Sequence, residues 1–297
     1  MAIISRAYQS EADYTALRQF LLNLPGSVLS AGNVTVGDLD WWRFHHENLD
    51  KMLDVQLWID DERDVVIGFA WPEGDSIDLF VDRRFREIEP EMIDWAIAHS
   101  RSNGDATLTI VANDRDSDRQ TSLTKRGFTG TDAYYTYRGQ SLEKAIPVPV
   151  LPDGYRFGDL VDADAAFIEA RVEVHRAAWD PSKYTVEKQL RVMGSPTYRP
   201  ELDLVVIGPV DAFASCAIVW FDEQNEFGVF EPVGCHPDHR QLGLTKALMY
   251  EGMRRLQVLG AKRAFVNSWH ASIPANRLYE SAGFQLVDKQ RKWTLTF

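Results

Sequence analysis

A turn rich in basic side chains lies in the second half of the chain, between an apolar segment and an amphipathic one. It runs from Cys235 to Gly243 and leads into a segment with helical periodicity. The first N–H groups of a helix have no partner within the helix and carry partial positive charge, so they bind phosphate. Gly243 has no side chain to block such a ligand, and Arg240, Thr245 and Lys246 add donors. The spacing indicates a phosphate or pyrophosphate site, with a plain strand–turn–helix connection as the alternative.

A second motif, Asn276-Arg-Leu-Tyr279-Glu-Ser-Ala-Gly-Phe284, follows further along the chain. Together the two segments resemble the acetyl-CoA-binding loop (Arg/Gln-x-x-Gly-x-Gly/Ala) and the Leu-Tyr-x-x-x-Gly-Phe motif of the GNAT superfamily of N-acetyltransferases. They occur in the family's order, separated by a helix and a strand. Two positions depart from the family pattern. Thr245 stands where Gly or Ala is preferred, and Ser272 stands where Asn is frequent.

The resemblance implies where acetyl-CoA binds. Backbone amides at a splayed strand would contact the pantetheine arm and the thioester carbonyl, and such preorganised donors act as an oxyanion hole. These amides belong to Val233, Gly234 and Cys235. The turn and the helix start would hold the pyrophosphate and its surroundings, through Arg240, Gln241, Leu242, Gly243, Leu244, Thr245 and Lys246. Ser272 and Asn276 would add polar contacts, and no metal is expected.

Several side chains near these motifs are candidates for proton transfer. Tyr279 is the candidate general acid, because a phenol with a reference pKa of about 10 can protonate a leaving thiolate at neutral pH. A tyrosine packed in the core is the alternative. Glu231 is the candidate general base, directly or through a water, with a solvent-facing strand residue as the alternative. His236 is a rival base. Cys235 as a nucleophile is less favoured than Cys235 as a core residue.

The resemblance predicts an acetyl-CoA-dependent N-acetyltransferase that acts on a primary amine of a small molecule by direct attack. Two such domains in one chain look like the tandem acetyltransferases that include mycothiol synthase, so acetylation of a cysteinyl amino-sugar is an alternative. A non-catalytic acyl-CoA-binding or regulatory protein is a second alternative, and a scaffold is a third. In this family the first two helices of a domain shape the acceptor site; here they carry Glu173, His175, Arg176, Trp179, Tyr184 and Met193.

The elements that must position these residues occur twice. Gly104 and Gly260 are 156 residues apart, as are Gly127 and Gly283, and equal offsets at two places indicate a duplication. In the first half we expect strands and helices at 3–6, 11–23, 38–51, 55–59, 65–71, 77–81 and 87–101. In the second half we expect them at 155–157, 162–178, 185–194, 204–207, 212–221, 227–235 and 243–258. This order predicts an α/β fold with a mixed sheet, as two tandem GNAT-like acyl-CoA N-acyltransferase domains.

A proline-rich segment separates the two copies, because three prolines within 147–152 favour an extended connector. We therefore expect a first domain at 1–142, a linker at 143–153 and a catalytic domain at 154–297. The stretch Trp41 to His46 is expected to be a helix with a core face and a surface face, and not a metal site.

The first copy departs from the phosphate-binding pattern. Matching Arg86 to Arg240 puts Glu89 and Glu91 at the two small-residue positions, and matching Arg84 puts Glu87 and Glu89 there. Leu123 stands at the position of the tyrosine. Since carboxylates repel a pyrophosphate, the first domain is expected not to bind acetyl-CoA.

Composition excludes several classes of protein. The 297 residues carry a net charge of −12, of which residues 1–150 contribute −10, so nucleic acid is an unfavourable partner. No apolar run reaches the roughly 18 residues of a membrane span. Cys216 and Cys235 are too few for a disulfide framework or a thiolate zinc site, so a reducing cytoplasm is expected. The expected partner is a small-molecule amine, without nucleic acid or membrane, for a monomer or homodimer.

Overall fold

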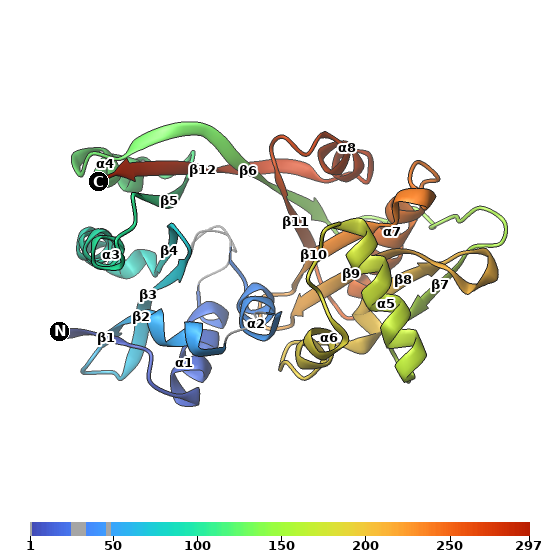
Figure 1. Cartoon of the computed structure of the whole chain (residues 1–297), viewed down its shortest axis with the longest axis horizontal. Helices are drawn as coiled ribbons and strands as arrows, with labels where there is room; N and C mark the ends of the chain where they lie inside the picture. Colours follow the sequence, from blue (N-terminus) through green and yellow to red (C-terminus); the bar gives the residue numbers. More distant parts are fainter. Residues whose placement is uncertain (1, 25–33, 46–48) are drawn as a thin grey trace. The chain divides into compact units, whose positions relative to one another are not determined.

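A computed structural model describes residues 2–24, 34–45 and 49–297 (Figure 1). The chain forms two compact units that interleave along the sequence. Unit 1 comprises Met1–Thr35, Asn48–Tyr137 and Asp288–Phe297, and unit 2 comprises Val36–Glu47 and Arg138–Val287. This division differs from a single boundary at 143–153. A helix from the first half packs in unit 2, and the last strand returns to unit 1.

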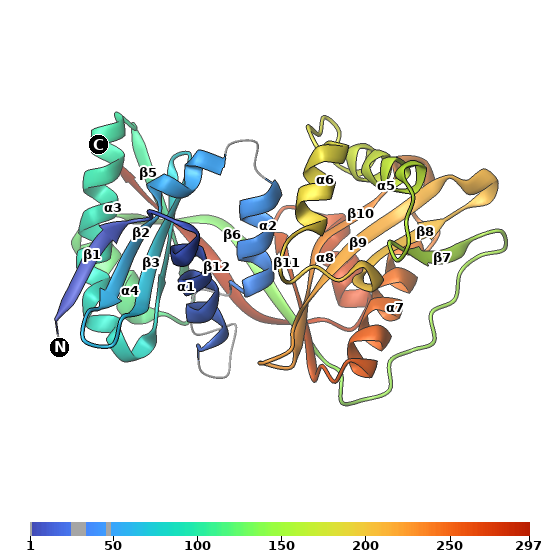
Figure 2. The same cartoon turned by 90° about the horizontal axis from the view of Figure 1, so that it is seen from below.

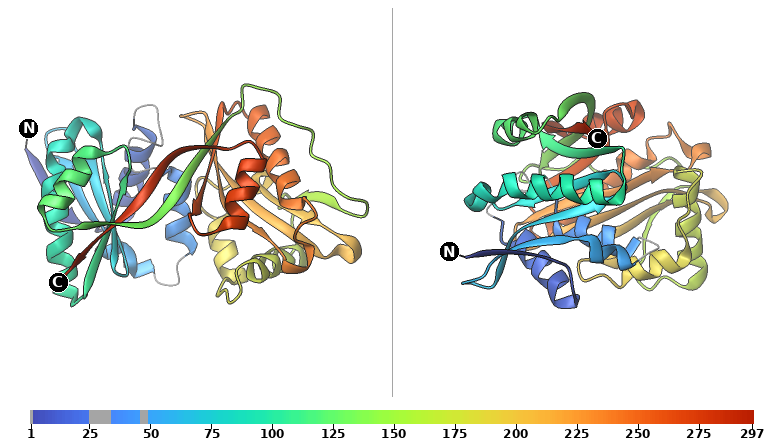
Figure 3. Two further views of the ribbon diagram at one scale, coloured as in Figure 1. Left: turned by 90° about the horizontal axis from the view of Figure 1, so that it is seen from above. Right: turned by 60° about the vertical axis from the view of Figure 1, so that its left-hand side comes forward.

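Unit 1 is a mixed sheet with helices. In spatial order its strands are β1 (Ile3–Ala7), β2 (Gln56–Asp60), β3 (Val65–Glu73), β4 (Ser76–Val81), β5 (Thr107–Asn113), β12 (Gln285–Thr296) and β6 (Thr129–Ser141). Neighbours β1 to β4 are antiparallel, β4 and β5 are parallel, and β12 is antiparallel to β5 (Figure 3). The helical segments are α1 (Glu11–Leu22), η1 (Leu49–Asp54), η2 (Arg83–Ile88), α3 (Glu89–Asn103) and α4 (Ser117–Lys125).

Unit 2 repeats this plan. The end of β6 is followed in space by β11 (Arg263–Trp269), β10 (Phe227–Cys235), β9 (Phe213–Asp222), β8 (Asp203–Ile207) and β7 (Arg156–Asp159). The pair β10–β11 is parallel, and β7 to β10 are antiparallel. The helices are α2 (Val36–His45), α5 (Ala165–Ala178), α6 (Val186–Met193), α7 (Leu244–Val258) and α8 (Ile273–Ser281). Three short 3-10 turns are η3 (Pro200–Leu202), η4 (Pro209–Asp211) and η5 (Pro237–His239). The mixed α/β fold expected from the sequence is confirmed.

Helix α7 covers one face of the unit 2 sheet. Its apolar stripe of Leu244, Leu248 and Leu256 is buried in the largest core cluster together with Phe230 of β10. Gly252 fills the missing step of this stripe, and a Cβ there would come within 2.7 Å of the Phe230 ring. The absence of a side chain at Gly252 therefore allows α7 to approach β10 closely.

Helices α5, α6 and α2 lie on the other face of the same sheet (Figure 2). Trp41 of α2 belongs to the core cluster there, with Trp220 of β9. A helix was expected at 38–51, but α2 ends at His45; residues 46–48, including His46, lie outside the described residues, and Leu49–Asp54 is the 3-10 turn η1. The alternation of β9 separates the two faces: Val219 packs toward α7, and Ile218 and Trp220 pack toward α2.

The duplication is visible in the backbone. Gly104 and Gly260 follow α3 and α7 with φ of +75° and +93°, and Gly127 and Gly283 follow α4 and α8 with φ of +86° and +98°. All four end a helix in the left-handed region that glycine tolerates best. The offset of 156 residues therefore joins structurally equivalent positions.

Candidate functional site

The parallel strands β10 and β11 separate partway along their length. They pair from Phe227 to Phe230 of β10 with Arg263 to Val266 of β11. Beyond Phe230, β10 bulges and continues along β9 as far as Cys235. Loss of pairing on the β11 side opens a gap at the carboxyl end of β10, where backbone groups can meet a ligand.

The register of β10 determines which amides face this gap. The N–H of His236 donates to the carbonyl of Ala214 on the β9 side at 2.9 Å. Because successive N–H groups of a strand point to opposite sides, Gly234 also faces β9. The N–H groups of Val233 and Cys235 therefore point into the gap. Two donors aimed at one place can polarise a carbonyl oxygen.

Gly234 is required by the packing above it. A Cβ at this position would lie 2.6 Å from the ring of Trp179, which follows α5 directly. The indole of Trp179 is 40% exposed and lines the cavity next to the gap. The backbone of β10 and an aromatic ring thus form one wall together.

The turn before α7 leaves space and donors at the helix start. Gly243 is the N-cap with φ of +76°, and a Cβ there would meet nothing within 4 Å. The N–H of Ala247 makes an intrahelical bond to the Gly243 carbonyl at 3.0 Å, whereas the amides of Leu244, Thr245 and Lys246 precede it and have no such acceptor. An anion can approach these amides closely.

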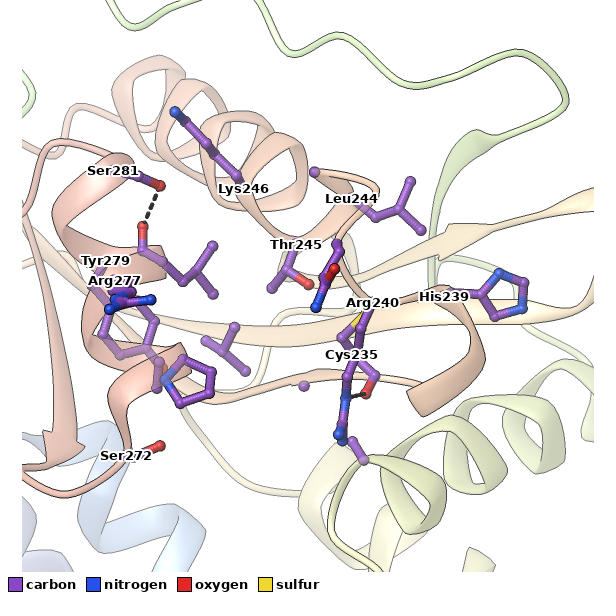
Figure 4. A pocket seen from close by; sticks show the side chains of 18 of the residues that line it. Cys235, His239, Arg240, Leu244, Thr245, Lys246, Ser272, Arg277, Tyr279 and Ser281 are labelled. Atoms are coloured by element: carbon purple, nitrogen blue, oxygen red, sulfur yellow. Dashed lines mark hydrogen bonds between the residues drawn. The ribbon is translucent and has the colours of Figure 1, made fainter.

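A cavity of about 900 Å³ joins the gap and the helix start (Figure 4). Most of the residues expected from the sequence line it: Val233, Gly234, Cys235, Arg240, Gln241, Gly243, Leu244, Thr245, Lys246, Ser272 and Tyr279. Residues that the sequence reasoning did not select also line it: Ala178, His239, Pro274, Ala275, Arg277, Leu278 and Ser281. Most of the latter belong to α8 or the residues beside it. Ala275 lies one helical turn before Tyr279, so helical spacing could have predicted it, and Leu278 is the residue next to Tyr279 in the same sequence motif.

Two expected binding residues lie away from the cavity wall. The side chain of Leu242 is 46% exposed and is not part of the lining. Asn276 is buried, and its amide donates to the carbonyls of Trp269, His270 and Ser272 at 2.9–3.2 Å. Asn276 therefore stabilises the connection between β11 and α8.

Thr245 is accommodated by an internal hydrogen bond. Its hydroxyl lies 3.0 Å from that of Ser215 on β9, and the residue is buried. The side chain is thus turned away from the space above Gly243, and its bulk does not crowd the turn. Burial also raises the pKa of the neighbouring Cys235 thiol, although Thr245 opposes this shift by a hydrogen bond. The thiol is therefore protonated at neutral pH, which disfavours Cys235 as a nucleophile.

Three cations surround the cavity: Arg240, Lys246 and Arg277. Within the described part of the chain, none of them has a carboxylate at ion-pair distance. The guanidinium of Arg240 bonds only the carbonyl of Cys235, at 3.4 Å, and Lys246 lies over the Tyr250 ring at 5.7 Å. Three uncompensated positive charges around a hollow favour a polyanionic ligand, even in a chain of negative net charge.

Tyr279 presents a buried phenol to the cavity. The residue is 6% exposed, and its hydroxyl makes no hydrogen bond to any described residue. Burial raises its pKa, and the nearby charge of Glu231 raises it further. The phenol is therefore a proton donor at neutral pH.

Glu231 faces the opposite side of β10 from α7. It follows Phe230, which packs toward α7, so its side chain points to the face covered by α2 and α5. Burial, and then the charge of Asp38, raise the pKa of Glu231 to about 8. The indole N–H of Trp220 donates to the Glu231 carbonyl at 2.6 Å and holds the backbone. Glu231 can thus accept a proton near neutral pH.

The rival base His236 is engaged elsewhere. Its Nδ1 accepts the N–H of Asp238 at 3.2 Å, which caps the 3-10 turn, and His236 does not line the cavity. The neighbouring His239 lines the cavity, and its Nδ1 lies 2.9 Å from the hydroxyl of Tyr155.

The expected acceptor-side residues divide into two groups. His175 and Tyr184 are buried and stack at 4.1 Å between centroids, and His175 contacts Trp179 at 4.5 Å. Burial, then the charge of Arg171, lower the pKa of His175 to about 3, so its ring is neutral. Glu173 and Arg176 form an exposed ion pair with each other at 2.8 Å. Met193 packs partly buried against the core near β8.

The described residues hold no group of three or more His, Cys, Asp or Glu side chains placed to bind a metal ion. Over the same ranges, no helix is both long enough and apolar enough to cross a membrane.

A splayed parallel strand pair, a helix start open to phosphate and a buried phenol define an acyltransferase that uses acyl-coenzyme A. Residues 167–284 match the family described as "Acetyltransferase (GNAT) family".

Whole-length relatives support the tandem arrangement. Mycothiol acetyltransferase of Corynebacterium aurimucosum is 23% identical over 260 residues, which span 78% of this chain and 81% of that protein. The structure is similar to a GCN5-related N-acetyltransferase from Sphaerobacter thermophilus, with a TM-score of 0.66, 17% identity and coverage of 99% and 95% of the two chains. It is also similar to a tandem GNAT protein from the clavulanic acid biosynthesis pathway, with a TM-score of 0.66, 14% identity and coverage of 99% and 98%. The expectation of a tandem GNAT fold is confirmed.

Proposed function

We propose that unit 2 binds acetyl-CoA in the cavity and transfers the acetyl group to a primary amine of a small molecule by direct attack. The observation that carries this proposal is the cavity itself. It brings together the free amides at the start of α7, the β10 amides facing the gap and the phenol of Tyr279.

Donor binding follows from the cavity lining. The N–H groups of Leu244, Thr245 and Lys246 donate hydrogen bonds to the pyrophosphate oxygens, because Gly243 leaves the space above them open. Arg240 and Arg277 balance the remaining phosphate charge. The pantetheine arm lies in the gap between β10 and β11, beside Trp179.

The reaction then needs two polarising donors, one base and one acid. The N–H groups of Val233 and Cys235 polarise the thioester oxygen, and a single such donor is worth about 3 kcal/mol. Glu231 removes a proton from the ammonium of the acceptor, the amine nitrogen attacks the carbonyl carbon, and the carbon–sulfur bond breaks. Tyr279 donates its proton to the departing thiolate and regains one from the new amide nitrogen.

We further infer that unit 1 does not bind acetyl-CoA. Helix α3 begins at Glu89 with Ile88 as its N-cap, whereas α7 begins at Leu244 with Gly243 as its N-cap. The structural offset is therefore intermediate between the two alignments considered from sequence. Ile88 stands opposite Gly243 and Pro90 opposite Thr245, and the glutamate occupies the first helical position.

Ion pairs fill this part of unit 1. Glu89 is buried and pairs with Arg86 at 3.0 Å and with Arg119. The Arg119 guanidinium also donates to the carbonyls of Leu79 on β4, at 3.0 Å, and of Val111 on β5, at 3.3 Å. A guanidinium thus bridges the two strands of unit 1 that correspond to β10 and β11.

The similarity to mycothiol acetyltransferase over most of both chains supports a second candidate acceptor, a cysteinyl amino-sugar. Such a molecule presents a primary amine and fits the same chemistry. An acceptor screen that includes cysteinyl amino-sugars beside simple amines separates the two versions.

Calorimetric titration with acetyl-CoA tests the donor site. We expect one site per chain, abolished by Gly243→Glu. Gly260→Glu is the matched control, because it places the same side chain at a positive-φ glycine with open space at the other end of α7. Two sites per chain would contradict the inference on unit 1, and no binding would contradict the proposal for unit 2.

A further inference from the structure

The end of β10 is held from one side only. Beyond the bulge between Phe230 and Val233, the strand pairs with β9 as far as Cys235 and no longer pairs with β11. Its orientation in this stretch therefore depends on contacts with β9. The two N–H groups that face the gap, those of Val233 and Cys235, belong to this stretch, so the contacts that fix the strand end also fix the direction of these donors.

A hydroxyl on β9 contacts this strand end. Ser215 is fully buried, and its hydroxyl donates to the carbonyl of Gly234 at 2.7 Å. Because a trans peptide is planar, the carbonyl of one residue and the N–H of the next residue point in opposite directions. The carbonyl of Gly234 faces β9, and the N–H of Cys235 in the same peptide faces the gap. Ser215 therefore holds the peptide that carries one of the two polarising donors.

A second hydroxyl extends this contact to the start of α7. The hydroxyl oxygens of Ser215 and Thr245 lie 3.0 Å apart. A serine hydroxyl has one proton, and that of Ser215 is shared with the Gly234 carbonyl, so Thr245 is the donor in this pair. Thr245 is buried in the first turn of α7 and lines the cavity. Two hydrogen bonds in series thus run from the helix start to the peptide between Gly234 and Cys235.

Packing alone does not require these two hydroxyls. Ser215 lies on the same face of β9 as Ala217 and Val219, which pack toward α7 in the apolar core. A buried hydroxyl costs free energy unless it is hydrogen-bonded, so a serine in this apolar row depends on its two hydrogen bonds. Thr245 likewise stands where the loops that this turn resembles have Gly or Ala. The two polar residues occur together, and each is the hydrogen-bond partner of the other.

We propose that Ser215 and Thr245 are positioning residues for acetyl transfer. Their hydroxyls fix the peptide between Gly234 and Cys235 so that the N–H of Cys235 points at the thioester oxygen, and they connect this donor to the pyrophosphate end of the cavity. Hydrogen bonds in series polarise one another, so the chain also strengthens the N–H of Cys235 as a donor. The proposal rests on the proposed function of unit 2 and adds the side chains that act through its polarising amides.

Infrared spectroscopy of bound acetyl-CoA, labelled with carbon-13 at the acetyl carbonyl, tests the proposal without an acceptor amine. A carbonyl that accepts a stronger hydrogen bond has a lower stretching frequency. We expect Ser215→Ala to raise this frequency above that in the wild type, while the dissociation constant of acetyl-CoA, measured by calorimetry, stays within twofold. An unchanged frequency, or loss of acetyl-CoA binding in this variant alone, would overturn the proposal.

Thr245→Ala tests whether the two hydroxyls act in series. It removes the outer hydroxyl and keeps the bond from Ser215 to Gly234, so we expect a smaller rise in frequency than in Ser215→Ala. Added to Ser215→Ala, it should raise the frequency no further, because the inner hydrogen bond is already lost. A rise of the same size in both backgrounds would show that Thr245 acts independently of Ser215 and would contradict the series.

Tyr198→Phe is the matched control. It also removes one hydroxyl hydrogen bond of unit 2, which Tyr198 donates to the carboxylate of Asp203 at 3.1 Å, and Tyr198 does not line the cavity. The carbonyl frequency in this variant is expected to equal that in the wild type. An equal rise in Tyr198→Phe and Ser215→Ala would indicate a general loosening of unit 2 and would overturn the proposal. Failure of acetyl-CoA to bind the wild type would instead overturn the proposed function.

Discussion

Arg119 of α4 and Ala275 of α8 occupy equivalent positions in the two units, 156 residues apart. Both lie three residues after the helix N-cap, which is Asp116 in α4 and Ser272 in α8. Ala275 lines the cavity of unit 2, whereas the Arg119 guanidinium bonds backbone carbonyls of both parallel strands in unit 1. In the same fold, the small side chain of Ala275 therefore leaves the cleft of unit 2 open, whereas the larger side chain of Arg119 fills the equivalent place in unit 1.

Arg119→Ala is expected to destabilise the protein without creating a second acetyl-CoA site. Removal of Arg119 leaves the buried carboxylate of Glu89 with only Arg86, and breaking a buried ion pair costs about 3–5 kcal/mol. Ile88 still blocks the helix start. Urea unfolding and calorimetric stoichiometry measure the two effects. Arg84→Ala is the control, since its side chain is 65% exposed and its pair with Asp82 is worth at most about 1 kcal/mol. Equal destabilisation by both variants, or a second site, would refute this account.

Tyr279→Phe is expected to lower turnover by about 100-fold or more while the dissociation constant of acetyl-CoA stays within twofold. The ring packing is kept and only the proton donor is lost. Stopped-assay turnover and calorimetry separate the two quantities. Tyr250→Phe serves as control, because its hydroxyl donates to the Ser281 carbonyl at 3.5 Å near the surface. If turnover in Tyr279→Phe equalled that of the wild type, Tyr279 would serve only to pack the core and not as a proton donor.

The pH dependence of kcat/KM is expected to follow Glu231. Its carboxylate is the base only when ionised, so kcat/KM rises with pH through an apparent pKa of about 8 and levels off above it. Glu231→Gln is expected to abolish the rise of kcat/KM with pH and to remove most of the activity. Asp38→Asn is expected to shift the rise of kcat/KM to lower pH, because a neutral neighbour no longer opposes the ionisation of Glu231. If kcat/KM rises over the same pH range in Asp38→Asn as in the wild type, the charge of Asp38 does not influence the ionisation of Glu231.

The raised pKa of Glu231 also predicts how the free energy of unfolding depends on pH. This quantity is expected to fall with rising pH, whereas kcat/KM is expected to rise. Its folded pKa of about 8 lies above the unfolded value of 4.5, so between these values the folded state holds more protons than the unfolded state. Stability contributed by this group therefore falls as the pH rises from 4.5 to 8. Melting temperatures of the wild type and Glu231→Gln at pH 5 and pH 8 test the sign. A variant that loses more stability on this rise than the wild type would contradict it.

The sequence predicted local features well, because they depend on neighbouring residues. The spacing around Gly243 and the motif at Tyr279 led to residues that do line one cavity. The sequence did not reveal that Asn276 lies away from the cavity wall, where its amide holds the turn between β11 and α8. The alignment of Ile88 with Gly243 could not be predicted either, because it depends on the length of the 3-10 turn that precedes α3.

Membership of α2 in unit 2 was beyond the reach of sequence patterns. Periodicity shows that a helix has an apolar face but not which sheet that face covers. The contact depends on Gly37 and Trp220, which are far apart in the chain. Asp38 was missed for the same reason, because its neighbour Glu231 is brought near only by this packing.

Gly37→Ala tests whether the docking of α2 controls the pKa of Glu231. The new methyl group would lie 2.4 Å from the Cβ of Trp220, so α2 must move away from β9, at a cost of about 1–3 kcal/mol in stability. Because Asp38 moves with the helix and its charge raises the pKa of Glu231, the apparent pKa of kcat/KM should fall while acetyl-CoA binding is unchanged. Urea unfolding and amine kinetics at saturating acetyl-CoA measure both effects. Gly194→Ala is the matched control: this glycine caps α6 with φ of −81°, and its nearest neighbour to a new Cβ is a carbonyl at 3.3 Å. If Gly37→Ala lowers stability yet leaves the pH profile of kcat/KM unchanged, α2 serves the fold of unit 2 and does not control the ionisation of Glu231.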